Sequence, residues 1–135
     1  MKRERYLLDT CALIWLLKGH ERMKSFVEKN KDYYPDWGVS LDSLREILYK
    51  TTANKITINY TYQQIMNLLK TYNIKICVFG LKELDTLSTL PYYSTHKDPN
   101  DRHIIATAIT EKRIVVTGDL DFAIYEKHGL QLLEI

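Results

Sequence analysis

Short apolar runs alternate along the chain with segments whose apolar residues recur at helical spacing. Five runs have the length and apolar character of strands, namely residues 6–8, 37–39, 74–79, 114–117 and 130–135. Helices are expected over residues 10–17, 20–30, 41–50, 62–72 and 80–89, and again from residue 99 onwards. Strands that alternate with helices form parallel sheets covered by helices on both faces. The pattern therefore predicts an α/β fold, a three-layer sandwich around a central parallel sheet of about four to five strands.

Composition indicates one globular unit. The 135 residues are 45% hydrophobic and 27% charged, which suffices for the core of a single domain over residues 1–135. The net charge of +2 is too small to indicate a nucleic-acid partner by itself. Cys11 and Cys77 lie inside apolar runs, and the sequence has no CxxC or zinc-ligand spacing, so both are expected to be reduced core residues.

The basic start of the chain resembles the start of a signal peptide, but the residues that follow it do not. Asp9 interrupts the apolar run that begins at Tyr6, and no cleavage pattern of small residues comes after it. No stretch of the sequence is long enough to span a bilayer. We therefore expect a cytoplasmic protein with no membrane partner.

A loop turns abruptly into a helix at Asp98 and Pro99, because Asp caps exposed amides and proline suits the first helical position. At about 100° per residue, Asp101 falls on the same face as Ile104 and Ala108, which is the face expected to be buried. A carboxylate on a buried face needs a partner, a proton or a metal ion. The alternative is that Asp101 only supports the cap, since the helix dipole favours an acid in the first turn.

Three further acids fall at positions from which they could reach the same cleft. Asp9 ends the first strand where a helix begins, and Asp119 follows a later strand. The carboxyl ends of parallel strands meet at the edge where α/β proteins build their sites. Glu46 continues a polar track with Ser40 and Ser43, which recur at every third residue of one helix. Simpler interpretations stay open, with Asp9 as a helix cap and Glu46 on a solvated face.

Clustered carboxylates repel one another and could not all stay ionised without a counter-charge. A divalent cation supplies that charge. Ligation by oxygen alone favours hard cations such as Mg²⁺ or Mn²⁺ and disfavours zinc. Mg²⁺ also binds substrate phosphates, which suits a phosphodiester. The expected cofactor is therefore Mg²⁺ (or Mn²⁺).

Four segments occur in a fixed order along the chain: Leu7-Leu8-Asp9-Thr10, Ser40-x-x-Ser43-x-x-Glu46, His96-x-Asp98-Pro99-x-Asp101-Arg102 and Val116-Thr117-x-Asp119-x-Asp121-Phe122. In order and spacing they resemble the motifs of PIN-domain ribonucleases. The resemblance is closest to the VapC-like toxins of type II (VapBC) toxin–antitoxin systems, and it covers essentially the whole chain. It implies a PIN-like α/β sandwich.

The resemblance also implies roles for individual residues. The core catalytic and metal-binding acids would be Asp9, Glu46, Asp101 and Asp119. Asp121 would be either a further metal ligand or the cap of the next helix. Residues that orient these carboxylates from behind would be Thr10, Ser40, Asp98 and Thr117, with Asp98 acting as a helix cap.

By the same resemblance, the chain would be a metal-dependent endoribonuclease that cuts RNA, forms a homodimer and is silenced by a cognate antitoxin protein. Residues flanking the cleft could hold RNA by stacking or by charge: Tyr92, Tyr93, His96, Lys97 and Arg102. Loop packing is the alternative for both tyrosines. The histidine is interpreted as a hydrogen-bonding residue rather than a general base.

Two features depart from the family pattern, and other function classes fit less well. Asn100 stands where an aromatic residue is frequent, and Gly118 stands where an arginine is common. Neither change removes an acid, so they bear on substrate preference. A phosphotransferase of the haloacid dehalogenase type needs a second Asp where this chain has Cys11. The remaining alternative is a catalytically lapsed PIN scaffold that binds RNA or a partner.

Overall fold

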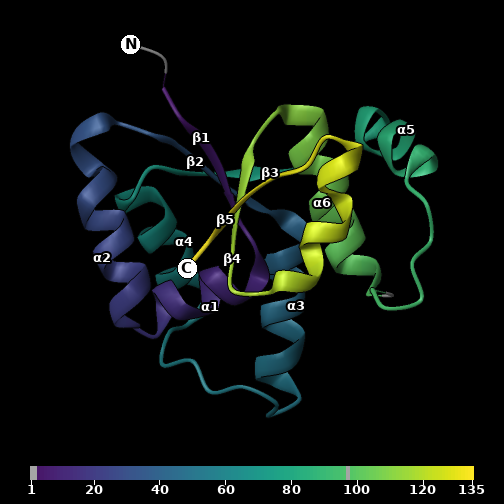
Figure 1. Cartoon of the computed structure of the whole chain (residues 1–135). Coiled ribbons are helices and arrows are strands. Elements are labelled where there is room, and N and C mark those ends of the chain that lie inside the picture. Colours follow the sequence, from purple (N-terminus) through teal and green to yellow (C-terminus); the bar gives the residue numbers. More distant parts are fainter. Residues whose placement is uncertain (1–2, 97) are drawn as a thin grey trace.

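The computed structural model describes residues 3–96 and 98–135. Its sheet is parallel throughout and has the strand order β3-β2-β1-β4-β5 (Figure 1). The strands are β1 (Arg5–Leu8), β2 (Asp36–Ser40), β3 (Ile74–Cys77), β4 (Ile114–Thr117) and β5 (Gln131–Glu134). The predicted α/β fold with a central parallel sheet is therefore confirmed, at the upper end of the expected number of strands.

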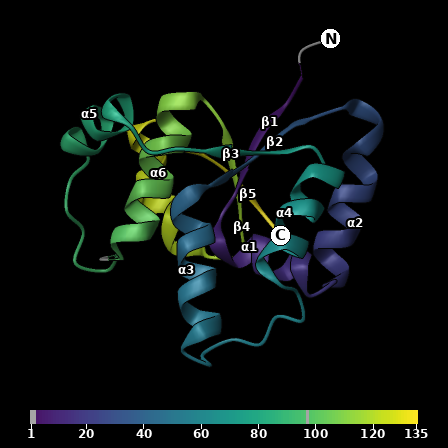
Figure 2. The same cartoon turned by 180° about the vertical axis from the view of Figure 1, so that it is seen from behind.

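Helices cover both faces of this sheet, as the sequence predicts (Figures 1 and 2). The α-helices are α1 (Thr10–Leu17), α2 (Glu21–Asn30), α3 (Leu41–Thr52), α4 (Tyr62–Thr71), α5 (Leu81–Thr89) and α6 (Pro99–Glu111). Two 3₁₀ segments, η1 (Lys31–Tyr33) and η2 (Leu120–His128), were not anticipated from the sequence. The third and fifth strands are shorter than the apolar runs that predicted them.

The core consists of two hydrophobic clusters, one on each face of the sheet. Alternate residues of β1 divide between them, because successive side chains of a strand point to opposite faces. Tyr6 and Leu8 belong to the cluster under α1, α2 and α4, whereas Leu7 belongs to the cluster under α6 and η2. This alternation makes the fold a three-layer sandwich.

Among the described residues, no helix combines the length and the apolar character needed to cross a bilayer.

The central pair of strands, β1 and β4, positions the candidate site at one edge of the sheet. β1 and β4 run side by side, with Leu8 opposite Val116, and the Asp9 N–H donates to the Val116 carbonyl at 3.2 Å. The residues that follow these two strands therefore emerge together at one edge of the sheet. The first turn of α6 lies beside this edge.

Candidate metal-binding active site

Asp9 is the most deeply buried of the predicted acids, and only 3% of its surface is exposed. Its Oδ1 caps α1 by accepting the Ala12 N–H at 2.7 Å. Its Oδ2 accepts the Thr117 hydroxyl at 2.5 Å. The same hydroxyl accepts the Asp119 N–H at 2.9 Å, so Thr117 links the ends of β1 and β4. Asp9 is thus both a helix cap and a site residue by position.

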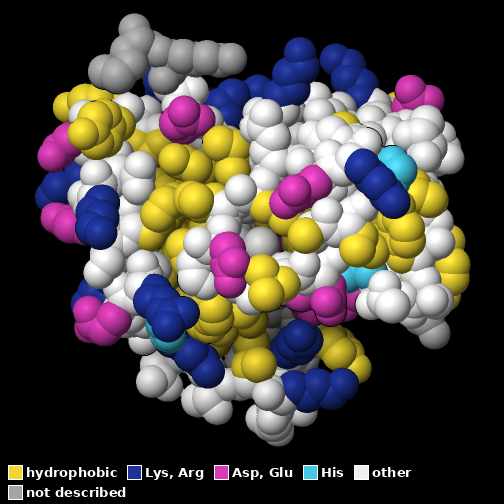
Figure 3. Space-filling model, in the orientation of Figure 1, with side chains coloured by type: hydrophobic (Ala, Val, Ile, Leu, Met, Phe, Trp, Pro, Cys, Tyr) yellow, Lys and Arg dark blue, Asp and Glu magenta, His cyan; other side chains and the backbone are white. Residues whose placement is uncertain are grey.

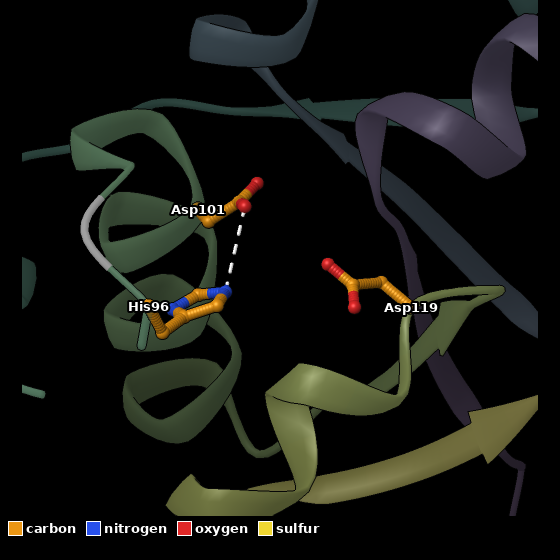
Figure 4. Close-up of side chains that lie close together, drawn as sticks. All are labelled: His96, Asp101 and Asp119. Carbon is orange, nitrogen blue, oxygen red and sulfur yellow. Dashed lines mark ion pairs between the residues drawn. The ribbon is translucent and has the colours of Figure 1, made fainter. Parts of the chain in front are cut away.

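Asp101 lies in the first turn of α6 and is held there by the cap that the sequence predicts. Oδ1 of Asp98 accepts the N–H groups of Asn100 at 2.8 Å and Asp101 at 3.4 Å. The Asp101 carboxylate turns toward His96 and Asp119, and its Oδ2 lies 3.5 Å from the His96 Nε2 (Figure 4). One ligand atom from each of these three residues lies within 4.8 Å of the other two.

Asp119 caps η2, because its Oδ1 accepts the Asp121 N–H at 2.9 Å. This corrects one of the two roles expected for Asp121, since the cap of the next helix is Asp119. The Asp121 side chain is exposed and is not part of the group formed by His96, Asp101 and Asp119. Sequence spacing could not separate the two acids, because either of them can cap a helix that begins at this point.

Glu46 lies on α3, which packs against both α1 and α6. Its carboxylate pairs with the Lys50 ammonium at 2.9 Å, and its side chain is largely buried. The hydroxyls expected to orient the acids from this side have other partners. Thr10 donates to the Ser43 hydroxyl at 2.9 Å, and Ser40 caps α3 by accepting the Asp42 N–H at 3.1 Å.

The pKa values of Asp9 and Asp101 depend on the acids around them. Burial, assisted by the charges of Asp119 and Glu46, raises the pKa of Asp9 to about 6 against hydrogen bonds from Thr117 and the Ala12 amide. Burial likewise raises the pKa of Asp101 to about 7, assisted by the charges of four neighbouring acids: Asp98, Asp9, Glu46 and Asp119. The predicted acids therefore lie close enough for their charges to raise the pKa of these two residues.

Asp42 is a buried acid that the sequence analysis did not select, with 2% of its surface exposed. It pairs with Arg45 and lies 3.4 Å from the Nδ1 of His103. A signal for it exists, because Asp42 lies four residues before Glu46 and so occupies the same face of α3. Ser40 reaches its Oδ2 at 3.5 Å and therefore does orient a carboxylate, although not one of the four predicted.

The predicted RNA contacts are in different environments. Tyr92 is 68% exposed and available to a ligand. The Tyr93 hydroxyl instead bonds to the His128 ring at 2.7 Å. Arg102 donates to the carbonyls of Leu90 and Pro91 and to a tyrosine hydroxyl, so it anchors the preceding loop. His96 is buried, and Lys97 lies outside the described residues.

Comparison with known families identifies the family of this chain. Residues 6–127 match the family model described as the PIN domain. The chain belongs to the PIN-domain family. The comparison with curated proteins yields no match.

Solved structures similar to this PIN domain include toxin–antitoxin complexes. VapBC2 from Rickettsia felis, bound to a promoter DNA fragment, shares 19% identity and a TM-score of 0.71 over 96% of this chain and 98% of that one. DNA-bound VapBC from Salmonella typhimurium shares 16% identity and a TM-score of 0.69, over 97% of this chain and 98% of that one. A toxin–antitoxin complex from Klebsiella pneumoniae shares 23% identity and a TM-score of 0.62, over 87% of this chain and 90% of that one. At these identities the likeness concerns the fold.

The donor set of this PIN domain fits a divalent cation. Two acids with raised pKa values face a buried edge of the sheet, and the nearby imidazole of His96 has no hydrogen-bond partner among the described residues. A buried imidazole without a hydrogen-bond partner and carboxylates close to one another are both costly, and a bound cation would offset both costs.

Proposed function

We propose that this PIN domain is a metal-dependent endoribonuclease that hydrolyses RNA phosphodiester bonds. The observation that carries the proposal is that the carboxylates at the carboxyl edge of the sheet lie close enough to help raise the pKa values of two of them. They come from four separate elements, yet the charges of the other acids contribute to the raised pKa values of Asp9 and Asp101. Strongly perturbed acids in one cleft are typical of active sites.

Each acid has a distinct part in this proposal. Asp9, Glu46, Asp101 and Asp119 would hold Mg²⁺ or Mn²⁺. A bound ion of this kind activates water and stabilises the charge that develops on phosphate oxygens. Thr117 fixes the Asp9 carboxylate, and the cap at Asp98 fixes the start of α6 that carries Asp101. Asp121, which is exposed, would contribute at most as an outer ligand.

The surface around the acids suits a polyanionic substrate. On the face seen in Figure 3, Lys and Arg side chains gather mainly along the upper and lower edges, while several acidic side chains lie between them. Basic side chains hold phosphates without reading sequence, and exposed aromatics such as Tyr92 stack on unpaired bases. These basic side chains and Tyr92 are compatible with RNA binding to this protein.

We further propose that the protein is the toxin of a toxin–antitoxin pair. It would form a homodimer and would bind a cognate antitoxin protein. The similarity of its fold to VapBC complexes supports this part of the proposal. An acidic, metal-binding cleft offers a basic side chain of an antitoxin a site that excludes substrate.

The test is incubation of purified, antitoxin-free protein with total RNA and Mg²⁺ or Mn²⁺. We expect defined RNA fragments that disappear with a chelator and with the Asp9→Asn variant. Asp32→Asn is the matched control, because Asp32 is an exposed acid on η1, and it should cleave as the wild type does. If folded, metal-loaded protein binds RNA but leaves it intact, the result would favour a catalytically lapsed PIN scaffold instead.

A further inference from the structure

His96 is fixed rather than free to turn. The backbone N–H of His96 donates to the Tyr93 carbonyl at 3.0 Å. Its ring meets Phe122 and Tyr125 edge to face, with centroid distances of 5.0 and 5.3 Å. Only 5% of its surface is exposed, so the imidazole cannot serve as an open contact for RNA. Packing of this kind selects one ring orientation before any ligand arrives.

The ring nitrogens of His96, Nδ1 and Nε2, make no hydrogen bond to any described residue, although Nε2 lies 3.5 Å from Oδ2 of Asp101. Nε2 points toward Asp101 and Asp119 (Figure 4). Burying an unpaired polar nitrogen beside carboxylates costs free energy that something in the site must offset.

We propose that His96 is itself a metal ligand, together with Asp101 and Asp119. This inference rests on the proposed function, because it concerns the same cleft. The three donors come from three separate elements: the loop before α6, the first turn of α6 and the start of η2. One atom from each converges within 4.8 Å, which is the spacing of a shared cation.

A nitrogen ligand changes which ion the site prefers. Mg²⁺ keeps oxygen ligands and near-ideal octahedral geometry, whereas first-row transition ions also accept imidazole. A cleft of carboxylates alone gives little reason to prefer Mn²⁺. With His96 in the donor set, Mn²⁺ is the favoured ion and Mg²⁺ the weaker one.

His103, on α6, provides the contrast to His96. Its ring stacks on Phe79, and its Nδ1, which also has no hydrogen-bond partner among the described residues, lies 3.4 Å from the Asp42 carboxylate that pairs with Arg45. No second acid is grouped with it among the described residues. His103 is therefore the matched control for any experiment on His96.

The test is electron spin echo spectroscopy of Mn²⁺ bound to the folded, RNA-free protein. We expect nitrogen modulation from a coordinated imidazole in the wild type and in His103→Gln, and its loss in His96→Gln. In a parallel titration, His96→Gln should weaken Mn²⁺ binding about tenfold or more, while Mg²⁺ binding changes less than about threefold.

The outcomes separate this inference from the proposed function. The inference is overturned if the wild-type protein shows no nitrogen modulation or binds no Mn²⁺. Neither result depends on how a variant folds. Modulation that survives in a folded His96→Gln protein also overturns it, and His96→Asn serves if the first variant does not fold. RNA cleavage with an all-oxygen Mn²⁺ signal would leave the ribonuclease standing. Nitrogen-ligated Mn²⁺ without cleavage would support the ligand and contradict the ribonuclease.

Discussion

At the scale of single residues, Thr117 lies where two of the proposed ligands meet. It donates its hydroxyl proton to Asp9 and accepts the Asp119 N–H. Thr117→Val keeps the shape but removes both bonds, so the pKa of Asp9 should rise further and protons should compete better with metal. We expect a loss of about 10- to 100-fold in metal affinity, measured by calorimetric titration.

Thr117→Ser is the control for that prediction, because it keeps the hydroxyl and should retain most of the affinity. The valine variant should also lose about 1–3 kcal/mol of unfolding free energy, since Asp9 Oδ2 is left buried without its donor. Equal metal affinity in the valine and serine variants would show that the hydroxyl does not orient the ligand.

Gly118 gives a second prediction at this scale. A Cβ at this position would lie 2.4 Å from Cη2 of Trp15, so the indole occupies the space that a side chain needs. Gly118→Ala should cost about 1–3 kcal/mol in urea unfolding, as overpacking does. Replacing Trp15 by Leu in the same protein should recover part of the loss, because contacting sites are not additive. Additive losses would contradict the steric explanation.

Sequence reasoning located the acids better than it located their neighbours. Asp9 and Asp101 were identifiable because strand ends and helix starts fix their places from local signals. His96 was expected to contact RNA, but its burial depends on Phe122 and Tyr125, which are distant in sequence. The contacts of loop residues are set by tertiary packing, which one sequence does not encode in its spacing.

At the scale of elements, the start of α6 can be tested without touching a ligand. Asp98→Ala removes the cap and should cost about 1 kcal/mol of unfolding free energy, read from thermal or urea unfolding. Asp98→Asn should keep that stability, since Asn also caps helices. Its neutral side chain should also lower the pKa of Asp101, because the charge of Asp98 helps to raise it. A loss with Asn as large as with Ala would contradict the capping role.

η2 shows why one element escaped the sequence analysis. Its buried residues are Phe122 and Tyr125, three positions apart, a spacing that matches the three residues per turn of a 3₁₀ helix. Such a pair is too little periodicity to distinguish a 3₁₀ helix from a turn. The strands β1, β2 and β4 were predicted because their apolar runs are buried on both faces and need no longer pattern.

At the scale of the whole molecule, the two edges of the sheet have separate tasks. Arg113 lies at the edge opposite the acids, and 3% of its surface is exposed. It donates to the Tyr6 carbonyl at 3.2 Å and to the carboxylates of Asp36 and Glu111 at 3.1 Å. These bonds tie together the amino ends of β1, β2 and β4. This network lies at the end of the strands opposite the candidate site.

Removing that arginine should therefore separate stability from function. Arg113→Met removes one ion-pair partner from Asp36 and from Glu111, which both keep Arg5, and should cost about 1–3 kcal/mol in urea unfolding. Arg113→Lys should recover little, because an ammonium cannot reproduce the forked donors of a guanidinium. Metal affinity of the folded fraction should be unchanged, and a large loss of it would contradict the separation of the two edges.

The acids at the other edge should give the metal-free protein an unusual pH dependence. In the folded state the pKa is about 6 for Asp9 and about 7 for Asp101, above the ordinary value of 3.8. Between these values the folded state binds more protons than the unfolded state, so stability falls as pH rises from about 4 to 7. Each unit of difference corresponds to about 1.4 kcal/mol.

A divalent cation should reverse this trend, because it binds the ionised carboxylates and releases their protons. We expect thermal unfolding with a chelator to give a lower midpoint at about pH 8 than at about pH 5, and added Mn²⁺ to stabilise mainly at the higher pH. An Asp9→Asn, Asp101→Asn double variant isolates the two groups, and its metal-free stability should depend less on pH. The same pH dependence in that variant would show that other residues cause it.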